Sequence, residues 1–348
     1  ISHVIRTARS DGLARARMHV PVSRATKPEA HDLATARDAL LAWIDRRSER
    51  EPGLAAYFLD GVPGHEFAER RAMLADRAPV VVAAGLRWLD DPAAWLMRHR
   101  LADPAPGEVA RSVVGPAAAH ADAPRLLRAL ASRAPREVGG ALWGRDDALA
   151  WELREQLPGD AMMRSLGNVH GDRGWALRER WLAERGGLDA IANDVMAAAI
   201  ACDSVAGLDD DRAWHVRKAL REAAPVAALD STYLVIDERS WQWRERFIVR
   251  APKVVMRTLA GLDHPRAWQL REQVASHCEE AIDSLFGLDG ERAWALREKA
   301  VWTWPATAVK SMGLHASSGR GRELMVTALA SHPGDVALWR QIAIRNRW

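Results

Sequence analysis

The chain has 348 residues, of which 48% are hydrophobic and 27% charged, a composition that excludes a disordered chain. No apolar run reaches the roughly 18 residues that a membrane span needs. Its net charge is +3 with a pI of about 9.1, so long-range attraction to phosphates is weak. Two distant cysteines, Cys202 and Cys278, are too few for a disulfide framework, so we expect a reducing, cytoplasmic location.

Residues 1–35 lack the regularity of the rest of the chain. They contain Pro21, Pro28 and several arginines, a composition that favours a linker or the tail of a preceding domain. The chain begins at Ile1 with no methionine, and we therefore expect a further N-terminal domain before it.

From residue 36 onward a tryptophan recurs with an arginine three positions later. The kernel is Trp-x-apolar-Arg, and it is clearest at Trp214, Trp241, Trp268 and Trp294, with spacings of 27, 27 and 26 residues. Such a fixed period is the signature of a repeat architecture. The structural repeat positions are Trp95, Arg98, Trp151, Arg154, Trp175, Arg178, Trp214, Arg217, Trp241, Arg244, Trp268, Arg271, Trp294 and Arg297.

A proline follows the tryptophan by 11 residues in four copies: Pro106, Pro225, Pro252 and Pro305. Proline favours the first turn of a helix, so each repeat is predicted to hold two short helices, the second starting at this proline. Two further features mark the ends of the helices. Gly207, Gly261 and Gly287 are predicted to stop the preceding helix in a left-handed conformation, and Asp209, Asp263 and Asp289 to cap the next one.

The sequence therefore predicts an all-α fold. Helices of about 10 residues are marginal alone and gain stability by stacking. We expect a right-handed α-solenoid of about 10–12 helix-pair repeats over residues 36–348, with a period of about 26 residues and a C-terminal cap from about residue 320. The step from Trp175 to Trp214 is longer, which indicates an insertion around residues 186–206.

The simplest role for the repeated tryptophan is to fill the space between neighbouring repeats. The alternative is an aromatic ladder that stacks bases or a flat ligand. The arginine after it is predicted to stack on the tryptophan or to form a ladder of ion pairs with acids of the adjacent repeat. A stripe that binds phosphate or acidic groups is the alternative for this arginine.

A second basic position falls five residues after the proline. It holds Arg111, Arg257 and Lys310, and Asp230 interrupts the series. A predicted loop at 317–322, with the sequence SSGRGR, adds Arg320 and Arg322. Solvated surface is the default interpretation, but these five residues are the candidate contacts to a partner or to phosphate.

Catalytic motifs are missing from the sequence. It contains no GxxxxGK[ST] loop, no GxSxG elbow and no HExxH, since His65-Glu66 lacks the second histidine. We therefore expect no cofactor, no metal site and no catalytic residue in this chain.

The run AGLDDDRAWHVRKALREAAP and its copy at 260–274 resemble the helical repeats that follow the kinase domain in large bacterial thymidylate-kinase-like proteins. The resemblance covers residues 200–310 best. It implies a repeat architecture and a preceding phosphate-binding domain, but no activity for this chain. A broader likeness is to HEAT-type α-solenoids.

Three functions are consistent with these features as hypotheses. The first is a binding or scaffold module of a larger bacterial protein, which offers a concave surface to a protein or ligand. The second is nucleic-acid binding along an arginine-lined groove. The third, by analogy alone, is a HEAT-like DNA-repair enzyme, which would need exposed tryptophans beside a carboxylate.

Overall fold

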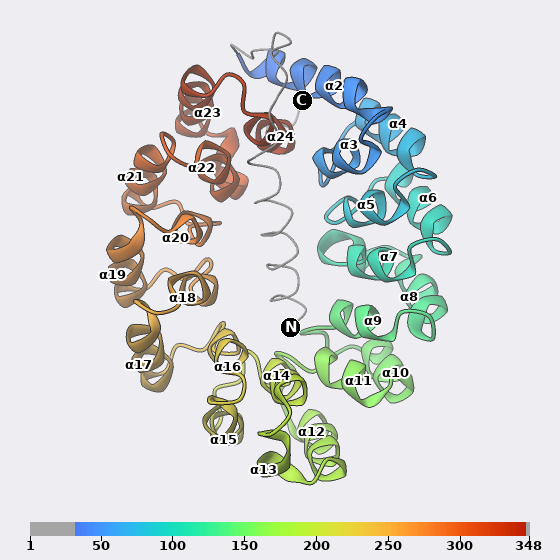
Figure 1. Cartoon of the computed structure of the whole chain (residues 1–348), viewed down its shortest axis with the longest axis vertical. Coiled ribbons are helices and arrows are strands. Elements are labelled where there is room, and N and C mark those ends of the chain that lie inside the picture. The colour runs from blue at the N-terminus through green and yellow to red at the C-terminus, as the bar shows by residue number, and fades with distance from the viewer. Residues whose placement is uncertain (1–31, 346–348) are drawn as a thin grey trace. The chain divides into compact units, whose positions relative to one another are not determined.

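The computed structural model describes residues 32–345 (Figure 1). Over this range the chain forms 23 α-helices and two 3-10 helices and contains no strand, which confirms the all-α prediction. The expectation for residues 1–35 falls almost wholly outside the described residues. The chain divides into two compact units, which are described separately.

The terminal unit comprises residues 32–141 and 247–345 among those described. Its helices come in pairs, a first helix followed by a second. Their bounds are α2 (Leu33–Ser48), α3 (Pro52–Phe58), α4 (His65–Leu74), α5 (Pro79–Ala84), α6 (Pro92–Leu101), α7 (Pro106–Ser112), η1 (Gly115–Ala119), α8 (Ala123–Ala131), α9 (Pro135–Ala141), α18 (Pro252–Thr258), α19 (Pro265–Val274), α20 (Glu279–Asp283), α21 (Glu291–Ala300), α22 (Pro305–Ser311), η2 (Gly313–Ser317), α23 (Gly319–Ser331) and α24 (Val336–Arg345).

The central unit comprises residues 142–246 among those described. Its helices are α10 (Ala148–Gln156), α11 (Gly159–Ser165), α12 (Asp172–Glu184), α13 (Gly187–Ile191), α14 (Val195–Ser204), α15 (Asp211–Leu220), α16 (Pro225–Asp230) and α17 (Glu238–Phe247). The inserted segment adds the short helix α13, after which α14 supplies the second helix of the Trp175 repeat.

The prolines start the second helices as predicted. Pro106, Pro225, Pro252 and Pro305 each occupy the first position of a helix. The residue before the proline is extended in φ, near −140° at Ala105, because the proline ring disfavours the helical conformation there. Each proline therefore separates the two helices of a repeat.

Each repeat also ends in a residue with positive φ, which we call the turn position. Gly207, Gly261 and Gly287 have φ of 80°, 71° and 83°, which confirms the predicted left-handed stop. The turn position is not always glycine. It holds Trp88, Asn168 and Leu234 in three repeats, with φ of 71°, 58° and 66°. Left-handed backbone costs a residue with a Cβ atom roughly 1–2 kcal/mol.

Within each unit the helices form two layers (Figure 1). The second helices pack on one another in a row, and each first helix packs on its own second helix. Three sets show the row: α3, α5, α7 and α9; α11, α14 and α16; α18, α20, α22 and α24. The core lies between the layers, where residues such as Leu86, Val109 and Ala213 are inaccessible to solvent.

Two local predictions were wrong. The helix caps are Asp210, His264 and Gly290, one residue later than predicted. The aspartates at 263 and 289 instead accept the indole N–H of Trp268 and Trp294, at 2.7 and 2.9 Å. The second concerns the SSGRGR segment. It contains the end of η2, the cap Ser318 and the first turn of α23, so it is not a loop.

Candidate binding surface

The repeated tryptophans are buried. Their exposed fractions run from 1% at Trp214 to 9% at Trp151, and the arginines three residues later are at most 1% exposed. Each such arginine lies over the ring of its own tryptophan, for example with 4.9 Å from the Arg271 guanidinium carbon to the Trp268 ring centroid. Neither side chain is available to an external ligand.

The buried arginine binds backbone carbonyls. In Arg271, Nε donates to Ser284 Oγ at 2.9 Å, Nη1 donates to the Leu262 carbonyl at 2.9 Å, and Nη2 donates to the Leu259 carbonyl. Leu259 follows α18 and Ser284 follows α20, so one guanidinium joins the C-terminal ends of two consecutive second helices. These ends carry unpaired carbonyls and partial negative charge, which a cation satisfies.

The same arrangement recurs in both units. Arg297 donates to the carbonyls of Leu285 and Leu288 and to Ser311 Oγ, at 2.9, 2.8 and 3.1 Å. In the central unit, Arg154 donates to the carbonyls of Leu142 and Arg145 and to Ser165 Oγ. We call this buried arginine, with its tryptophan and its carbonyl partners, the repeat joint.

Burial lowers the pKa of the joint arginines well below its ordinary value, to about 10, and neighbouring carboxylates partly offset this effect. The group comprises Arg98, Arg154, Arg178, Arg217, Arg244, Arg271 and Arg297. They stay charged at neutral pH. The predicted ion-pair ladder on these arginines is therefore replaced by a set of charge-assisted bonds to backbone carbonyls.

An ion-pair ladder does exist, but on arginines that the sequence-based prediction missed. Arg173 and Arg292, two residues before the tryptophan, pair with Glu155 and Glu272 of the preceding repeat, both at 2.8 Å. The signal was visible, because an arginine two residues before the tryptophan recurs at Arg173, Arg212, Arg239, Arg266 and Arg292.

These second arginines also cover the tryptophan of the preceding repeat. The guanidinium of Arg173 lies 4.2 Å from the Trp151 ring centroid, and that of Arg212 lies 4.6 Å from the Trp175 ring centroid. Both of these tryptophans therefore contact two arginines, one from their own repeat and one from the next. This is a cation–π arrangement that holds adjacent repeats together.

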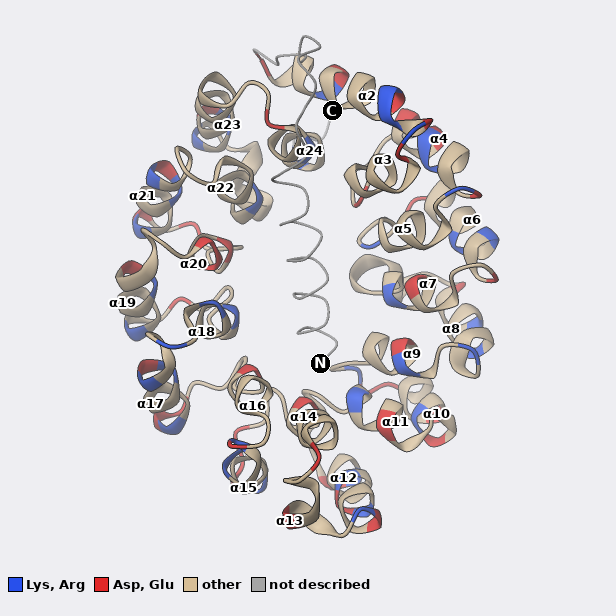
Figure 2. Cartoon of the chain, in the orientation of Figure 1, with Lys and Arg blue, Asp and Glu red and all other residues tan. Residues whose placement is uncertain are grey.

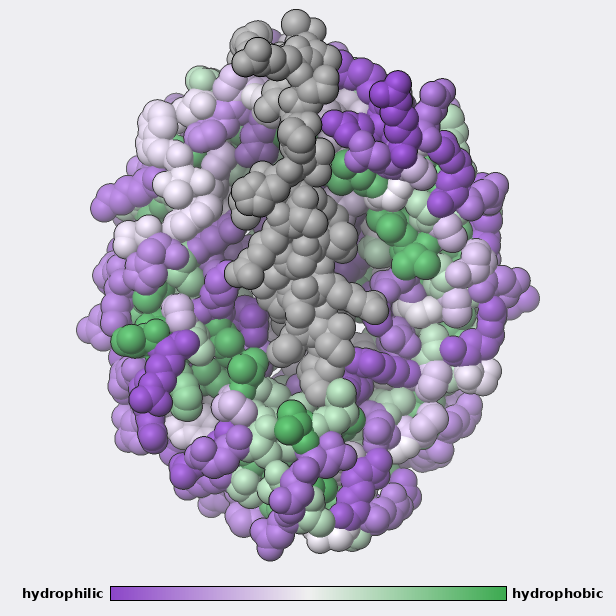
Figure 3. Space-filling view, viewed as in Figure 1, coloured by the Kyte–Doolittle hydropathy of each residue, from purple (hydrophilic) through white to green (hydrophobic). Residues whose placement is uncertain are grey.

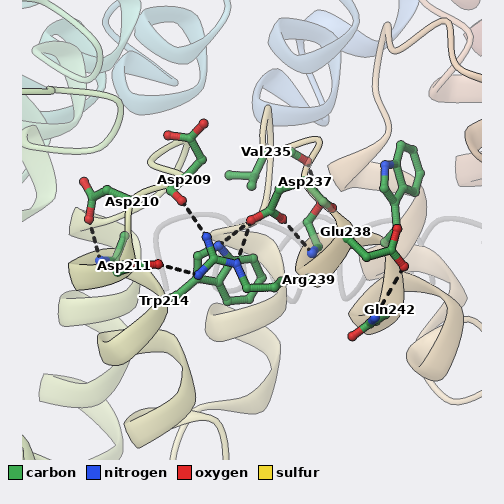
Figure 4. A network of polar contacts seen from close by, with 12 residues as sticks. Asp209, Asp210, Asp211, Trp214, Val235, Asp237, Glu238, Arg239 and Gln242 are labelled. Atoms are coloured by element: carbon green, nitrogen blue, oxygen red, sulfur yellow. Dashed lines mark hydrogen bonds and ion pairs between the residues drawn. The ribbon is translucent and has the colours of Figure 1, made fainter.

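Figure 4 shows this contact in the central unit. Trp214 Nε1 donates to Asp237 Oδ2 at 2.8 Å, and Arg239 Nε donates to the same oxygen at 2.9 Å. Arg239 also bonds Asp211 and the Asp209 carbonyl. Burial opposes ionisation of Asp237, but hydrogen bonds from the Ser240 N–H and from Arg239 outweigh it, so the pKa of Asp237 is lowered.

The repeat formed by α8 and α9 lacks the joint. There Leu126 is buried in α8 at the tryptophan position, and Ala129 stands at the arginine position three residues later. His120 stacks on the tryptophan of the preceding repeat, with its ring 4.1 Å from that of Trp95 and nearly parallel to it.

The candidate basic residues do not form a free positive track. Arg111 pairs with Glu108 and with Glu137, the latter at 2.7 Å, and Lys310 lies 2.8 Å from Asp283. Arg320 binds Glu291 and Glu298, both at 2.8 Å. Figure 2 shows the general pattern, with basic and acidic residues interspersed on the same helices.

The remaining two candidates differ from each other in exposure. Arg257 is half-buried on α18, and Arg322 is exposed in the first turn of α23. All five candidates lie in the terminal unit, but they are spread over four helices, α7, α18, α22 and α23, and the structure does not gather them into one site.

Large apolar side chains are exposed near the turn positions. Figure 3 shows a mostly hydrophilic face with small hydrophobic patches, one of them over α5. In the terminal unit Trp88 is 58% exposed, and Phe286 and Leu314 are also exposed. The sequence did not single out these residues, since an isolated apolar residue carries no local signal of its exposure.

In the central unit we call four residues at or beside the turn positions the edge cluster: Trp143, Tyr233, Leu234 and Ile236. Trp143 and Tyr233 come from different repeats, yet their ring centroids are 6.2 Å apart. Leu234 and Ile236 are exposed by 51% and 59%. The Trp143 ring lies so close to Gly167 that a Cβ atom there would overlap it. Glycine is therefore required beneath the indole.

The described part of the chain offers neither a metal site nor a membrane span. Within residues 32–345, no group of three His, Cys, Asp or Glu side chains could hold a metal ion. None of the helices in that range is long and apolar enough to cross a membrane.

No family model, no curated protein and no solved structure matches the chain. The resemblance to the repeats of bacterial thymidylate-kinase-like proteins therefore stays a prediction.

Proposed function

We propose that the chain is a non-catalytic binding or scaffold module that engages a protein partner through the edge cluster. We further propose that its helix pairs form a right-handed α-solenoid with a period of about 26 residues, and that it works in the cytoplasm. The packed row of second helices and the even spacing of the turn positions support this architecture.

The observation that carries the proposal is that the side chains of the repeat joint are buried, whereas the apolar side chains of the edge cluster are exposed. The repeated tryptophans and their arginines are used internally, and most of the candidate cations pair with acids. The edge cluster, in contrast, keeps apolar side chains in water. Grouped exposed apolar residues mark interaction sites, and Leu234 is held there on backbone with a positive φ. Strain of this kind concentrates at functional positions.

The test is to remove the apolar surface without disturbing the core. The test variant combines Trp143→Ser with Ile236→Ser and so removes two apolar side chains of the edge cluster. The matched control is Leu96→Ser in the terminal unit, where Leu96 is 72% exposed. We expect proteins that co-purify with the wild type to be lost from the double variant and kept by the control. Equal recovery from all three would contradict the proposal.

Nucleic-acid binding along an arginine-lined groove is the alternative. The pI of 9.1 favours it, and the ion pairs on Arg111, Lys310 and Arg320 argue against it. Affinity for a DNA duplex that falls steeply as salt rises would support this alternative. The analogy with a DNA-repair enzyme required exposed repeat tryptophans, and these are buried.

A further inference from the structure

The last described helix packs on the first. In the terminal unit, α24 lies between α22 and α2 (Figure 1). Its Arg340 is 280 residues from Asp60, yet Arg340 Nη2 binds Asp60 Oδ2 at 2.5 Å and Arg340 Nε donates to the Asp60 carbonyl at 3.0 Å. The last helix pair therefore stacks on the first.

This contact uses the chemistry of the repeat joint. The Arg340 guanidinium lies 5.2 Å from the Tyr57 ring centroid while it binds the carbonyl just after α3. Five residues on, Arg345 donates to the Lys310 carbonyl in α22 at 3.0 Å and lies over the Phe286 ring. The two arginines of α24 thus attach it to the second helices on both of its sides.

The attachment of α24 depends little on its own connector. The helix buries Leu338, Trp339 and Ile342, and it packs against α22 and α2 much more extensively than against α23, its neighbour in sequence. The connector between α23 and α24 is short, His-Pro-Gly-Asp at 332–335. Its hydrogen bonds to the helix are short-range: Asp335 Oδ1 accepts from the N–H groups of Ala337 and Leu338 at 2.8 and 3.1 Å, and Trp339 Nε1 donates to the Pro333 carbonyl at 3.0 Å.

A helix held by remote parts of the chain keeps the same contacts whichever copy supplies it. At low protein concentration α24 binds within its own chain, because the connector gives this helix a high effective concentration at its own site. Exchange of such an element is a known low-cost route to dimers. We propose that the site between α22 and α2 also binds α24 of a second copy of this chain, giving a dimer in which the two copies exchange this helix.

Charge reversal at the contact between Asp60 and Arg340 distinguishes exchange of α24 between two copies from its binding within one chain. A chain with Asp60→Arg carries two arginines at the contact, and a chain with Arg340→Asp carries two aspartates, so neither can restore the pair within itself. Mixed together, the two chains restore both pairs, but only across copies. We expect the equimolar mixture to give a species of about twice the monomer mass in size exclusion with light scattering, and each variant alone to stay monomeric.

Two further variants complete the test. The chain with both Asp60→Arg and Arg340→Asp can close on itself and should be monomeric. Deletion of Pro333 and Gly334 shortens the connector, so that α24 no longer reaches its own site, and this variant should be a dimer. A monomeric mixture overturns the proposal. If one of the single charge-reversal variants loses its helical circular dichroism signal, it has not folded, and the test then rests on the Pro333–Gly334 deletion variant. A monomeric deletion variant overturns the proposal.

Discussion

Arg239 lies 5.0 Å from the centroid of the Trp214 ring, although the two residues belong to different repeats. Both donate to the same oxygen of Asp237. Trp214 also contacts Arg217, whose guanidinium binds carbonyls at the ends of two second helices. The tryptophan thus links a buried cation of its own repeat to a more exposed cation of the next.

The buried tryptophans should carry much of the stability. Trp268→Ala removes a side chain that is 5% exposed, together with its cation–π contacts to Arg271 and Arg292. We expect a loss of about 3–5 kcal/mol in the free energy of unfolding, measured in urea. Trp302→Ala is the control, because this residue is 63% exposed, and it should change stability by less than about 0.5 kcal/mol. Similar losses of unfolding free energy in both variants would contradict the stabilising role of the buried tryptophan.

Leu234 should tolerate glycine. Its positive φ costs about 1–2 kcal/mol, and glycine removes that strain while adding about 0.5–1 kcal/mol of unfolded-chain entropy. We expect Leu234→Gly to leave the urea midpoint unchanged or slightly raised, while Leu229→Gly, at a buried residue of the same repeat, lowers it strongly. A large loss in Leu234→Gly would show that its side chain is part of the core.

Asp237 should contribute to acid sensitivity. Its pKa is lowered in the folded chain, since hydrogen bonds from Ser240 and Arg239 outweigh the effect of burial. The stabilisation is therefore present above the unfolded value, about 3.9, and is lost as pH falls through the folded value. Asp237→Asn should lose less stability than the wild type as the pH is lowered from neutral into the range where carboxylates titrate. Parallel urea curves for the two proteins would contradict this assignment.

The cysteines should stay protonated well into alkaline pH. Burial raises the pKa of Cys202 to about 12, and burial with Glu280 raises that of Cys278 to about 11. An unfolded thiol titrates near about 8.5, so between that pH and about 12 the unfolded chain has released a proton that the folded chain keeps. Stability should therefore fall as pH rises through this window.

The measurement for Cys202 compares urea unfolding at neutral pH and near about pH 10. The wild type should lose about 2 kcal/mol more than Cys202→Ala, from about 1.36 kcal/mol for each pKa unit. A thiol reagent should also react far more slowly with the folded chain than with the chain in urea. Rapid labelling of the folded protein would mean that Cys202 is accessible.

Much of the fold could be predicted because its signals are local. Pro106 and Gly261 each fix a helix boundary through their own backbone preferences, so the helix pairs could be expected from spacing alone. The hydrogen-bond partners of Arg271 could not be predicted, because every residue has a backbone carbonyl and the sequence does not show which carbonyls the fold leaves unpaired. The sequence suggested an ion pair with acids of the adjacent repeat where the structure has a contact to backbone carbonyls.

The edge cluster could not be predicted from the sequence for a different reason. Trp143 and Tyr233 meet across repeats that are far apart in the sequence, and this depends on how α11, α14 and α16 stack. The contact between α24 and α2 likewise joins helices far apart in the sequence, so no local sequence pattern predicts it.

The most direct test of the repeat joint compares its two kinds of arginine. Arg271 is fully buried on the carbonyls, whereas Arg292 stacks on the same tryptophan from the exposed side. Arg271→Met leaves several buried acceptors without a donor and should lower the free energy of unfolding by about 3–5 kcal/mol. Arg292→Met should lower it by no more than about 1 kcal/mol. Equal effects in urea unfolding, or a neutral Arg271→Met, would contradict the structural role of the repeated motif.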